Sequence, residues 1–325
     1  MDDTSTLQFK SINYTSQSAG PRRAPRLIVM GAVHGNETCG TRAIARVMAQ
    51  LDSGELSVAA GSVTFVPIAN PLAYAKNERA GERNLNRNLA PNDAPQDFED
   101  RIANWLCPLL AQHDVLLDLH SFNASSEPFV MVGPRDNDGP LQPFRHEAEE
   151  RALARRLGVR RFVDGWLSTY SDGVVRRMAT RPAGELEKVI RYGVGTTEYM
   201  RQTGGYALTL ECGQHDDPAA PEVAYRAIMN TLAFLGLVDL PAPPAIAAEQ
   251  MEALSMVAVY DKAGAGDTFS RPWASFDRVQ AGEEIGRRED GTPVTAEFDG
   301  LILFPDSKAA AGNEWYYLTT VNGAF

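Results

Sequence analysis

Short apolar runs alternate with amphipathic segments along the first three-quarters of the chain. The runs with the length and composition of buried strands are 26–30, 62–68, 114–119 and 206–210. The segments with a helical pattern are 38–51, 95–111, 147–157 and 221–235, the third of them charged and expected at the surface. Residues 160–195 show no regular pattern. Strands that alternate with helices predict an α/β fold, so we expect a mixed, mainly parallel sheet flanked by helices.

The last quarter of the chain has a different pattern. Pro241, Pro243 and Pro244 favour a stiff, extended linker. Beyond them, glycines separate the strand-like runs 255–260, 278–285, 293–304 and 315–320. We therefore expect an α/β domain over 1–240, a linker over 241–250 and a small all-β domain over 251–325.

Composition narrows the function classes. The net charge of −11 argues against binding to nucleic acid, which needs a basic face. Three cysteines without a Cys-x-x-Cys pair argue against a disulfide framework. No apolar run approaches the roughly 20 residues that span a bilayer, and residues 1–5 lack the apolar core of a signal peptide. We expect a cytoplasmic protein that binds neither membrane nor nucleic acid; a homo-oligomer is compatible with this composition.

Ionisable side chains follow three of the predicted strands. His34 and Glu37 lie in the loop after the first run, His120 ends the third, and Glu211 ends the fourth. Ligands of parallel α/β sheets bind beyond the carboxyl ends of the strands. These four side chains are therefore expected to lie close together.

Two imidazoles and one carboxylate are a ligand set for zinc. His34, Glu37 and His120 would leave a fourth coordination position for water, as a catalytic zinc requires, whereas a structural site is closed by four ligands and is typically rich in cysteine. We predict one Zn²⁺ per chain, held by these three residues.

Two further carboxylates have alternative interpretations. Asp118 faces the same way as His120 if both lie in one strand, so it either orients a ligand imidazole or caps a neighbouring loop. Glu211 is either a general base for the water of a nearby metal or a strand-end carboxylate paired with an arginine. Near it in the sequence, His215 is expected in a surface loop or at the rim of the site.

Arg79, Arg83 and Arg87 are spaced four residues apart. This spacing is typical of one face of an exposed helix. Gly81 and the asparagines around it favour turns instead.

The motifs at these positions resemble those of the aspartoacylase and succinylglutamate desuccinylase family, relatives of the zinc carboxypeptidases. The matching segments, in this order, are 31–37 (GAVHGNE), 83–87 (RNLNR), 118–120 (DLH) and 209–213 (TLECG). The resemblance covers nearly the whole chain. It implies a carboxypeptidase-like α/β zinc hydrolase domain over 1–240 and a barrel-sandwich-like β domain over 251–325, without a lysine at its hairpin to carry a cofactor.

The resemblance also implies roles for individual residues. His34, Glu37 and His120 would hold zinc, and Glu211 would act as the general base. Asn86 and Arg87 would bind a substrate carboxylate, Arg79 would polarise the scissile carbonyl, and Arg201 would bind a second carboxylate. The family has a catalytic tyrosine in its C-terminal region, for which Tyr260, Tyr316 and Tyr317 are the candidates here.

We therefore predict a zinc-dependent amidohydrolase that deacylates a small N-acyl amino acid. One alternative is a zinc carboxypeptidase that acts on small peptides, although the β domain is expected to narrow the cleft. A second alternative is a non-catalytic relative that binds metal and carboxylates, although such a protein would not need Glu211.

Overall fold

A computed structural model describes residues 7–16, 24–177 and 191–323. Residues 1–5, where no signal peptide is expected, lie outside this part of the chain. In the irregular segment 160–195, the structure forms β6 (Arg161–Asp164) and α5 (Trp166–Arg177), and residues 178–190 are not described. None of the helices among the described residues is long and apolar enough to cross a membrane.

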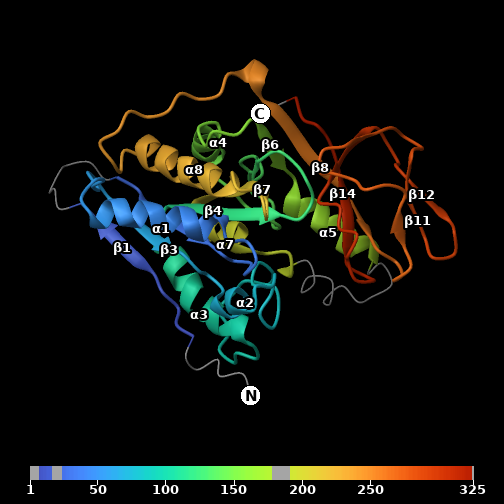
Figure 1. The fold of residues 1–325 in the computed structure, drawn as a ribbon, viewed down its shortest axis with the longest axis horizontal. Helices are drawn as coiled ribbons and strands as arrows, with labels where there is room; N and C mark the ends of the chain where they lie inside the picture. Colours follow the sequence, from blue (N-terminus) through green and yellow to red (C-terminus); the bar gives the residue numbers. More distant parts are fainter. Residues whose placement is uncertain (1–6, 17–23, 178–190, 324–325) are drawn as a thin grey trace.

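The described residues form an 11-stranded main sheet (Figure 1). Its order is β1 (Ile12–Thr15), β3 (Ser62–Val66), β2 (Arg26–Gly31), β4 (Val115–Phe122), β7 (Tyr206–Gln214), β5 (Phe129–Met131), β6, β8 (Glu252–Asp261), β14 (Glu314–Val321), β13 (Gly300–Leu303) and β10 (Arg278–Val279). Strands β3, β2, β4 and β7 run parallel to one another, and β1 and β5 are antiparallel to their neighbours β3 and β7. The predicted mixed, mainly parallel sheet with flanking helices is confirmed.

Alternate residues of the central strands pack into two different apolar cores. In β2, Leu27 and Val29 contact the core formed with α1 (Cys39–Asp52) and α8 (Ala220–Phe234). Ile28 and Met30 contact the other core, formed with α3 (Phe98–Leu110). Successive side chains of a strand point to opposite faces, so a sheet covered on both faces needs continuous apolar runs. The other helices within the described residues include α2 (Pro71–Lys76), α4 (Glu147–Ala154) and α7 (Thr196–Gln202).

The parallel register brings the ends of three strands to one edge of the sheet. Met30 of β2 pairs with Asp118 of β4, and His120 of β4 pairs with Glu211 of β7. The loop that follows β2 therefore lies on one side of His120, and Glu211 lies on the other side of His120.

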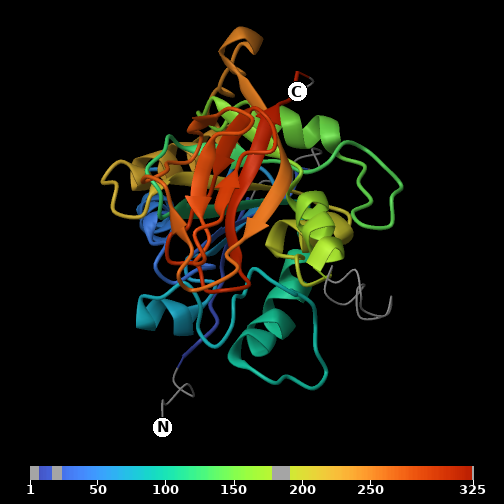
Figure 2. The same ribbon diagram turned by 90° about the vertical axis from the view of Figure 1, so that its right-hand side faces the viewer.

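The main sheet continues into the C-terminal part of the chain. Residues Ala248–Gln250 form a short 3-10 helix, and β8 then pairs with β6 in parallel, with Arg161 opposite Glu252. Strands β9 (Thr268–Phe269), β11 (Glu284–Arg287) and β12 (Pro293–Thr295) form a separate three-stranded antiparallel sheet (Figure 2). The described residues beyond Met251 form strands and loops, as the glycine-rich pattern predicts. The division into domains at 240 and 250 stays a prediction.

Candidate active site

The loop after β2 has a conformation that its small residues permit. Ala32 has a positive φ of 48°, and residues 34–37 then turn toward the start of α1. Gly35 lies against α2, where a Cβ atom would come within 2.0 Å of the carbonyl carbon of Ala73. A side chain at position 35 would push this loop away from α2. Gly35 thus lets His34 and Glu37 approach β4.

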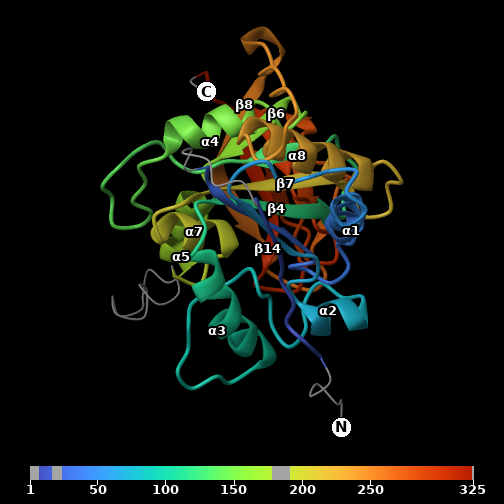
Figure 3. The same ribbon diagram turned by 90° about the vertical axis from the view of Figure 1, so that its left-hand side faces the viewer.

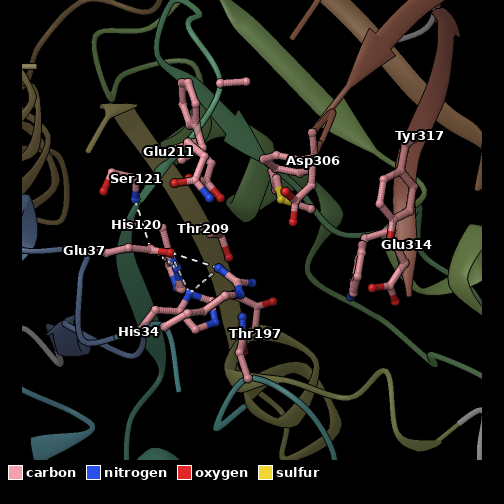
Figure 4. Close-up of a pocket in the computed structure, with 18 of the residues that line it drawn as sticks. His34, Glu37, His120, Ser121, Thr197, Thr209, Glu211, Asp306, Glu314 and Tyr317 are labelled. Atoms are coloured by element: carbon pink, nitrogen blue, oxygen red, sulfur yellow. Dashed lines mark hydrogen bonds and ion pairs between the residues drawn. The ribbon is translucent and has the colours of Figure 1, made fainter. Parts of the chain in front are cut away.

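His34, Glu37 and His120 converge on one point (Figure 4). Nδ1 of His34 lies 2.8 Å from Oε1 of Glu37, and Nδ1 of His120 lies 2.9 Å from Oε2 of the same carboxylate. The three ligand atoms lie within 4.8 Å of one another, and all three side chains are buried. Two imidazoles and one carboxylate in this arrangement suit a divalent metal such as zinc. The predicted ligand set is therefore present as one cluster.

The outer nitrogens of both imidazoles also have partners. Nε2 of His34 lies 3.0 Å from Oδ1 of Asn84, and Nε2 of His120 lies 3.0 Å from Oδ2 of Asp118. Asp118 also accepts a hydrogen bond from Oγ1 of Thr196 at the start of α7. It therefore contacts both the histidine and a neighbouring segment, which are the two alternatives that the sequence left open. Such partners orient an imidazole so that the other nitrogen can bind a metal.

The pKa values of all three side chains are shifted by burial and by their neighbours' charges. Burial and the Arg79 charge lower the pKa of His34 to about 4. Burial alone would raise the pKa of Glu37, but the charges of the two histidines hold it well below its usual range. Burial opposes the protonation of His120, yet Asp118 and Glu37 raise its pKa well above the ordinary value.

Arg79 places a positive charge beside the same ligand atoms. Its Nη1 lies 3.1 Å from Oε1 of Glu37 and 3.2 Å from Nδ1 of His34. The segment from 79 to 88 forms bends and turns, so the alternative of an exposed helix with Arg79, Arg83 and Arg87 on one face is wrong. Arg83 instead pairs with Asp97 and Asp100, away from the cluster.

His34, Glu37 and His120 lie at one end of a cavity, and Glu211 also lines this cavity, next to them (Figure 4). It is 7% exposed, and its Oε2 has no hydrogen-bond partner within the described residues. Burial raises the pKa of this carboxyl well above its ordinary value. A buried carboxylate without a partner is costly unless a ligand satisfies it. No salt bridge joins Glu211 to an arginine among the described residues, so the structure does not support the alternative that these two groups are paired.

Asn86 and Arg87 line the same cavity. Oδ1 of Asn86 accepts a hydrogen bond from the backbone N–H of Thr196. Nη1 of Arg87 donates to the backbone oxygen of Asn86, and its guanidinium carbon lies 4.6 Å from the ring centroid of Trp166. These contacts hold both side chains at the wall of the cavity.

Arg201 also lines the cavity, but most of its donors bind other protein groups. Nε and Nη2 donate to the two oxygens of Glu150, and Nη2 also donates to the backbone oxygen of Ala207. Nη1 lies 3.7 Å from Oε1 of Glu198, and the Arg201 side chain is only 3% exposed. The structure thus places Arg201 in a buried network of ion pairs at the edge of the cavity.

Further side chains line the cavity beside these residues. His215 lines it and lies 2.8 Å through Nδ1 from Oγ of Ser121, the residue after His120. Of the three tyrosine candidates, Tyr317 lines the cavity. Tyr260 and Tyr316 instead stack on each other, with their ring centroids 4.7 Å apart, in another apolar cluster. Asp306, Glu314, Thr197 and Thr209 also line the cavity. Their positions depend on long-range packing, which local periodicity does not reveal.

Comparisons with known proteins agree with this fold. Residues 23–157 match the family model of the succinylglutamate desuccinylase/aspartoacylase catalytic domain, which confirms the resemblance. A solved succinylglutamate desuccinylase/aspartoacylase from Rhodobacter sphaeroides has a TM-score of 0.69 at 18% identity, covering 97% of this chain and 90% of that one. The ectoine utilization protein EutE (DoeB) from Ruegeria pomeroyi has a TM-score of 0.66 at 17% identity, covering 91% and 85%. A succinylglutamate desuccinylase from Vibrio cholerae has a TM-score of 0.64 at 19% identity, covering 92% and 82%. These similarities show a shared fold; no curated protein sequence matches the chain.

Proposed function

Through residues 23–157 this chain belongs to the succinylglutamate desuccinylase/aspartoacylase family, and from that premise we propose that it is a zinc-dependent amidohydrolase that releases an amino acid from a small N-acyl amino acid. The main support for the proposal is that His34, Glu37 and His120 line the same cavity as Glu211, whose Oε2 has no hydrogen-bond partner among the described residues. A binding protein would have no need for that buried carboxylate beside a metal cluster.

His34, Glu37 and His120 would hold the zinc ion. When bound, zinc would supply a Lewis acid for the scissile carbonyl and lower the pKa of water toward neutrality. Asp118 and Asn84 keep the two imidazoles oriented for this task.

Glu211 acts in this proposal as the general base. It takes a proton from the attacking water and delivers it to the nitrogen of the leaving amine. Arg79 donates to the oxygen on which negative charge develops, for which its position beside Glu37 is suited. Arg87 and Asn86 hold a carboxylate of the substrate, and the planar guanidinium of Arg87 can bind two oxygens at once.

The test is a panel of N-acetyl and N-succinyl amino acids given to the zinc-loaded protein, with the released acetate or succinate measured. A panel of short peptides runs beside it. We expect turnover of N-acyl amino acids and little or none of the peptides. The opposite preference would identify a carboxypeptidase, and binding without turnover in either panel would identify a non-catalytic relative.

A variant with an altered base separates chemistry from metal binding. Glu211→Gln keeps the size of the side chain but cannot accept the proton. We expect it to retain one zinc per chain and to lose most of the turnover. Undiminished turnover would refute the role of Glu211.

A further inference from the structure

The residues assigned to the substrate lie on a loop without helix or strand. Residues 79–88 form bends and turns, and Arg79, Asn86 and Arg87 line the cavity from this segment. Buried backbone N–H and C=O groups outside regular elements need other hydrogen-bond partners. The partners of this loop therefore decide how accurately its side chains are placed at the cavity.

A buried carboxylate holds the first half of the loop. Glu99 of α3 is fully buried and accepts hydrogen bonds from Nδ2 of Asn70 and from three consecutive backbone N–H groups, those of Gly81, Glu82 and Arg83. The three backbone nitrogens lie 3.1, 3.2 and 3.1 Å from its oxygens. A Cβ atom at position 81 would come within 2.5 Å of Oε1, so a side chain there would displace the carboxylate. The segment 81–83 is thus fixed to α3.

The side chain of Arg83 extends this attachment to the second half of the loop. Its Nε donates to Oδ2 of Asp97 at 2.8 Å, and its Nη2 donates to Oδ1 of Asp100 at 2.9 Å. Its Nη1 donates to the backbone oxygen of Arg87 at 2.8 Å and to that of Asn84 at 3.3 Å. One planar guanidinium thus connects two acids at the start of α3 to the backbone of Arg87.

Other contacts of Arg87 come from a different part of the chain. The backbone N–H of the next residue, Asn88, donates to the backbone oxygen of Tyr192 at 2.8 Å. The guanidinium of Arg87 lies over the ring of Trp166. Loss of Arg83 would release the Arg87 backbone from α3 while these contacts remain, so the side chain would shift. A shift of about 1 Å in a group that positions a substrate can cost about 100-fold in rate.

We propose that Arg83 is a positioning residue, which fixes the backbone from which Arg87 reaches the carboxylate of the substrate. This inference rests on the proposed deacylase function, and it gives a role to the first residue of the 83–87 segment. Arg83 is not among the described residues that line the cavity, so it acts through Arg87. Its removal should therefore weaken carboxylate recognition and leave the zinc content at one ion per chain.

The first test is a double-mutant cycle between Arg83 and Arg87. Wild type, Arg83→Met, Arg87→Ala and the double variant are compared on the N-acyl amino acid of the panel above that is turned over best. We expect Arg83→Met to lower kcat/KM by about 10- to 100-fold, mainly through a raised KM. In the Arg87→Ala background the same change should cost at most about threefold, because the side chain that Arg83 positions is already gone. Equal losses in both backgrounds would overturn the proposal.

The second test measures binding and needs no turnover. Calorimetry gives Kd for the tightest-binding N-acyl amino acid of the same panel and for its carboxamide, in which each carboxylate is neutral. The proteins are zinc-loaded Glu211→Gln and Glu211→Gln with Arg83→Met. We expect Arg83→Met to raise Kd of the acid by about tenfold or more and that of the carboxamide much less. Equal weakening of both ligands would mean a general distortion of the cavity and would overturn the proposal.

Two further variants control for loss of the fold. Arg83→Lys keeps a charge beside Asp97 and Asp100, but one ammonium cannot also reproduce the planar donation to the Arg87 backbone. Its kcat/KM should lie between those of wild type and Arg83→Met, and its thermal unfolding should stay near that of wild type. Arg101→Met removes an exposed arginine of the same helix and should change neither kcat/KM nor Kd.

The outcomes separate this inference from the function on which it rests. If no compound of the panel is turned over, but Arg83→Met weakens binding of the acid more than that of the carboxamide, the deacylase function falls and the role of Arg83 stands. If N-acyl amino acids are turned over and Arg83→Met affects acid and carboxamide alike, the deacylase function stands and the role of Arg83 falls.

Discussion

Nη1 of Arg79 lies 3.1 Å from Oε1 of Glu37, beside the point where the ligand atoms converge. A guanidinium at this position indicates that the cluster attracts a cation. The Arg79 side chain is 53% exposed, so it can turn toward the cavity when another cation takes its place at Glu37. The same arginine can then contact the substrate.

Removal of Arg79 should separate catalysis from metal binding. Arg79→Ala is expected to keep one zinc per chain, because Arg79 is not one of the three ligands. Turnover should fall by about 10²–10³-fold, the usual effect of losing one donor to a developing oxyanion. Elemental analysis and kcat for the best N-acyl amino acid measure the two effects. Arg79→Lys keeps the charge without the planar donors, so its kcat should lie between those of the wild type and Arg79→Ala. Loss of zinc from Arg79→Ala would contradict the prediction.

Asn84 should tune metal affinity without touching the metal. Its Oδ1 contacts Nε2 of His34, and it also accepts from the backbone N–H of Asn86. Asn84→Ala leaves the His34 ring without this partner, so zinc affinity should fall by about 10- to 100-fold. Competition with a chromogenic chelator measures the affinity. Asn84→Asp, which retains an acceptor oxygen, should lose less. Equal affinity of wild type and Asn84→Ala would show that His34 is oriented by its packing alone.

Much of the fold could be predicted because its strands are local and apolar. Residues of β2, β3, β4 and β7 are buried in two apolar cores, and Figure 3 shows helices on both sides of β4 and β7. Strands covered on both faces need continuous apolar runs, which can be recognised in the sequence. The ligand triad was predicted for the same reason, because its members follow strands whose ends meet at one edge. No local signal marks the pairing of β6 with β8, which joins Arg161 to Glu252.

The parts of the site that were missed depend on tertiary contacts. Asp306 lies in a loop and Glu314 at a strand end, and only packing across the sheet brings them to the cavity. The charged helix predicted at 147–157 was expected at the surface, yet Glu150 in α4 is 1% exposed. The sequence does not show whether a charged residue such as Glu150 is paired in the core with an opposite charge such as Arg201.

Asp267 should make the stability of the C-terminal part depend on pH. Burial alone would raise its pKa, but Arg288 and the backbone N–H groups of Ala263, Gly264 and Glu289 lower it to about 2. A lowered pKa contributes stability above the unfolded value of about 4, and this contribution is lost as pH falls toward 2. Asp267→Asn should therefore lower the free energy of unfolding by about 2 kcal/mol at pH 7.

The check for Asp267 is urea unfolding of wild type and variant at several pH values. The difference between them should shrink between pH 4 and pH 2, where the wild-type carboxyl becomes protonated. Glu289→Gln is the comparison, because that acid is exposed in the same segment. A difference that stays constant with pH would mean that Asp267 acts by shape rather than by charge.

The ion pair between Arg201 and Glu150 should stabilise the fold at the edge of the cavity. Glu150 accepts from Nε and Nη2 of Arg201 and from the backbone N–H groups of Gly133 and Ala207, and both side chains are buried. Removing one partner of a buried pair leaves the other charge uncompensated, at a cost of about 3–5 kcal/mol. We expect Glu150→Ala and Arg201→Met each to lower the free energy of unfolding by about this amount.

Kinetics of the same two variants decide whether Arg201 also binds a substrate carboxylate, as the family resemblance implies. Because Glu150 and Ala207 occupy Nε and Nη2, only Nη1, near Glu198, is left to face the cavity. If Arg201 acts by holding the cavity edge, both variants should change KM to a similar degree and lose stability together. If it binds substrate directly, Arg201→Met should raise KM well beyond Glu150→Ala. A raised KM in Arg201→Met with an unchanged free energy of unfolding would contradict the stability role, because a buried charged pair cannot be broken without that cost.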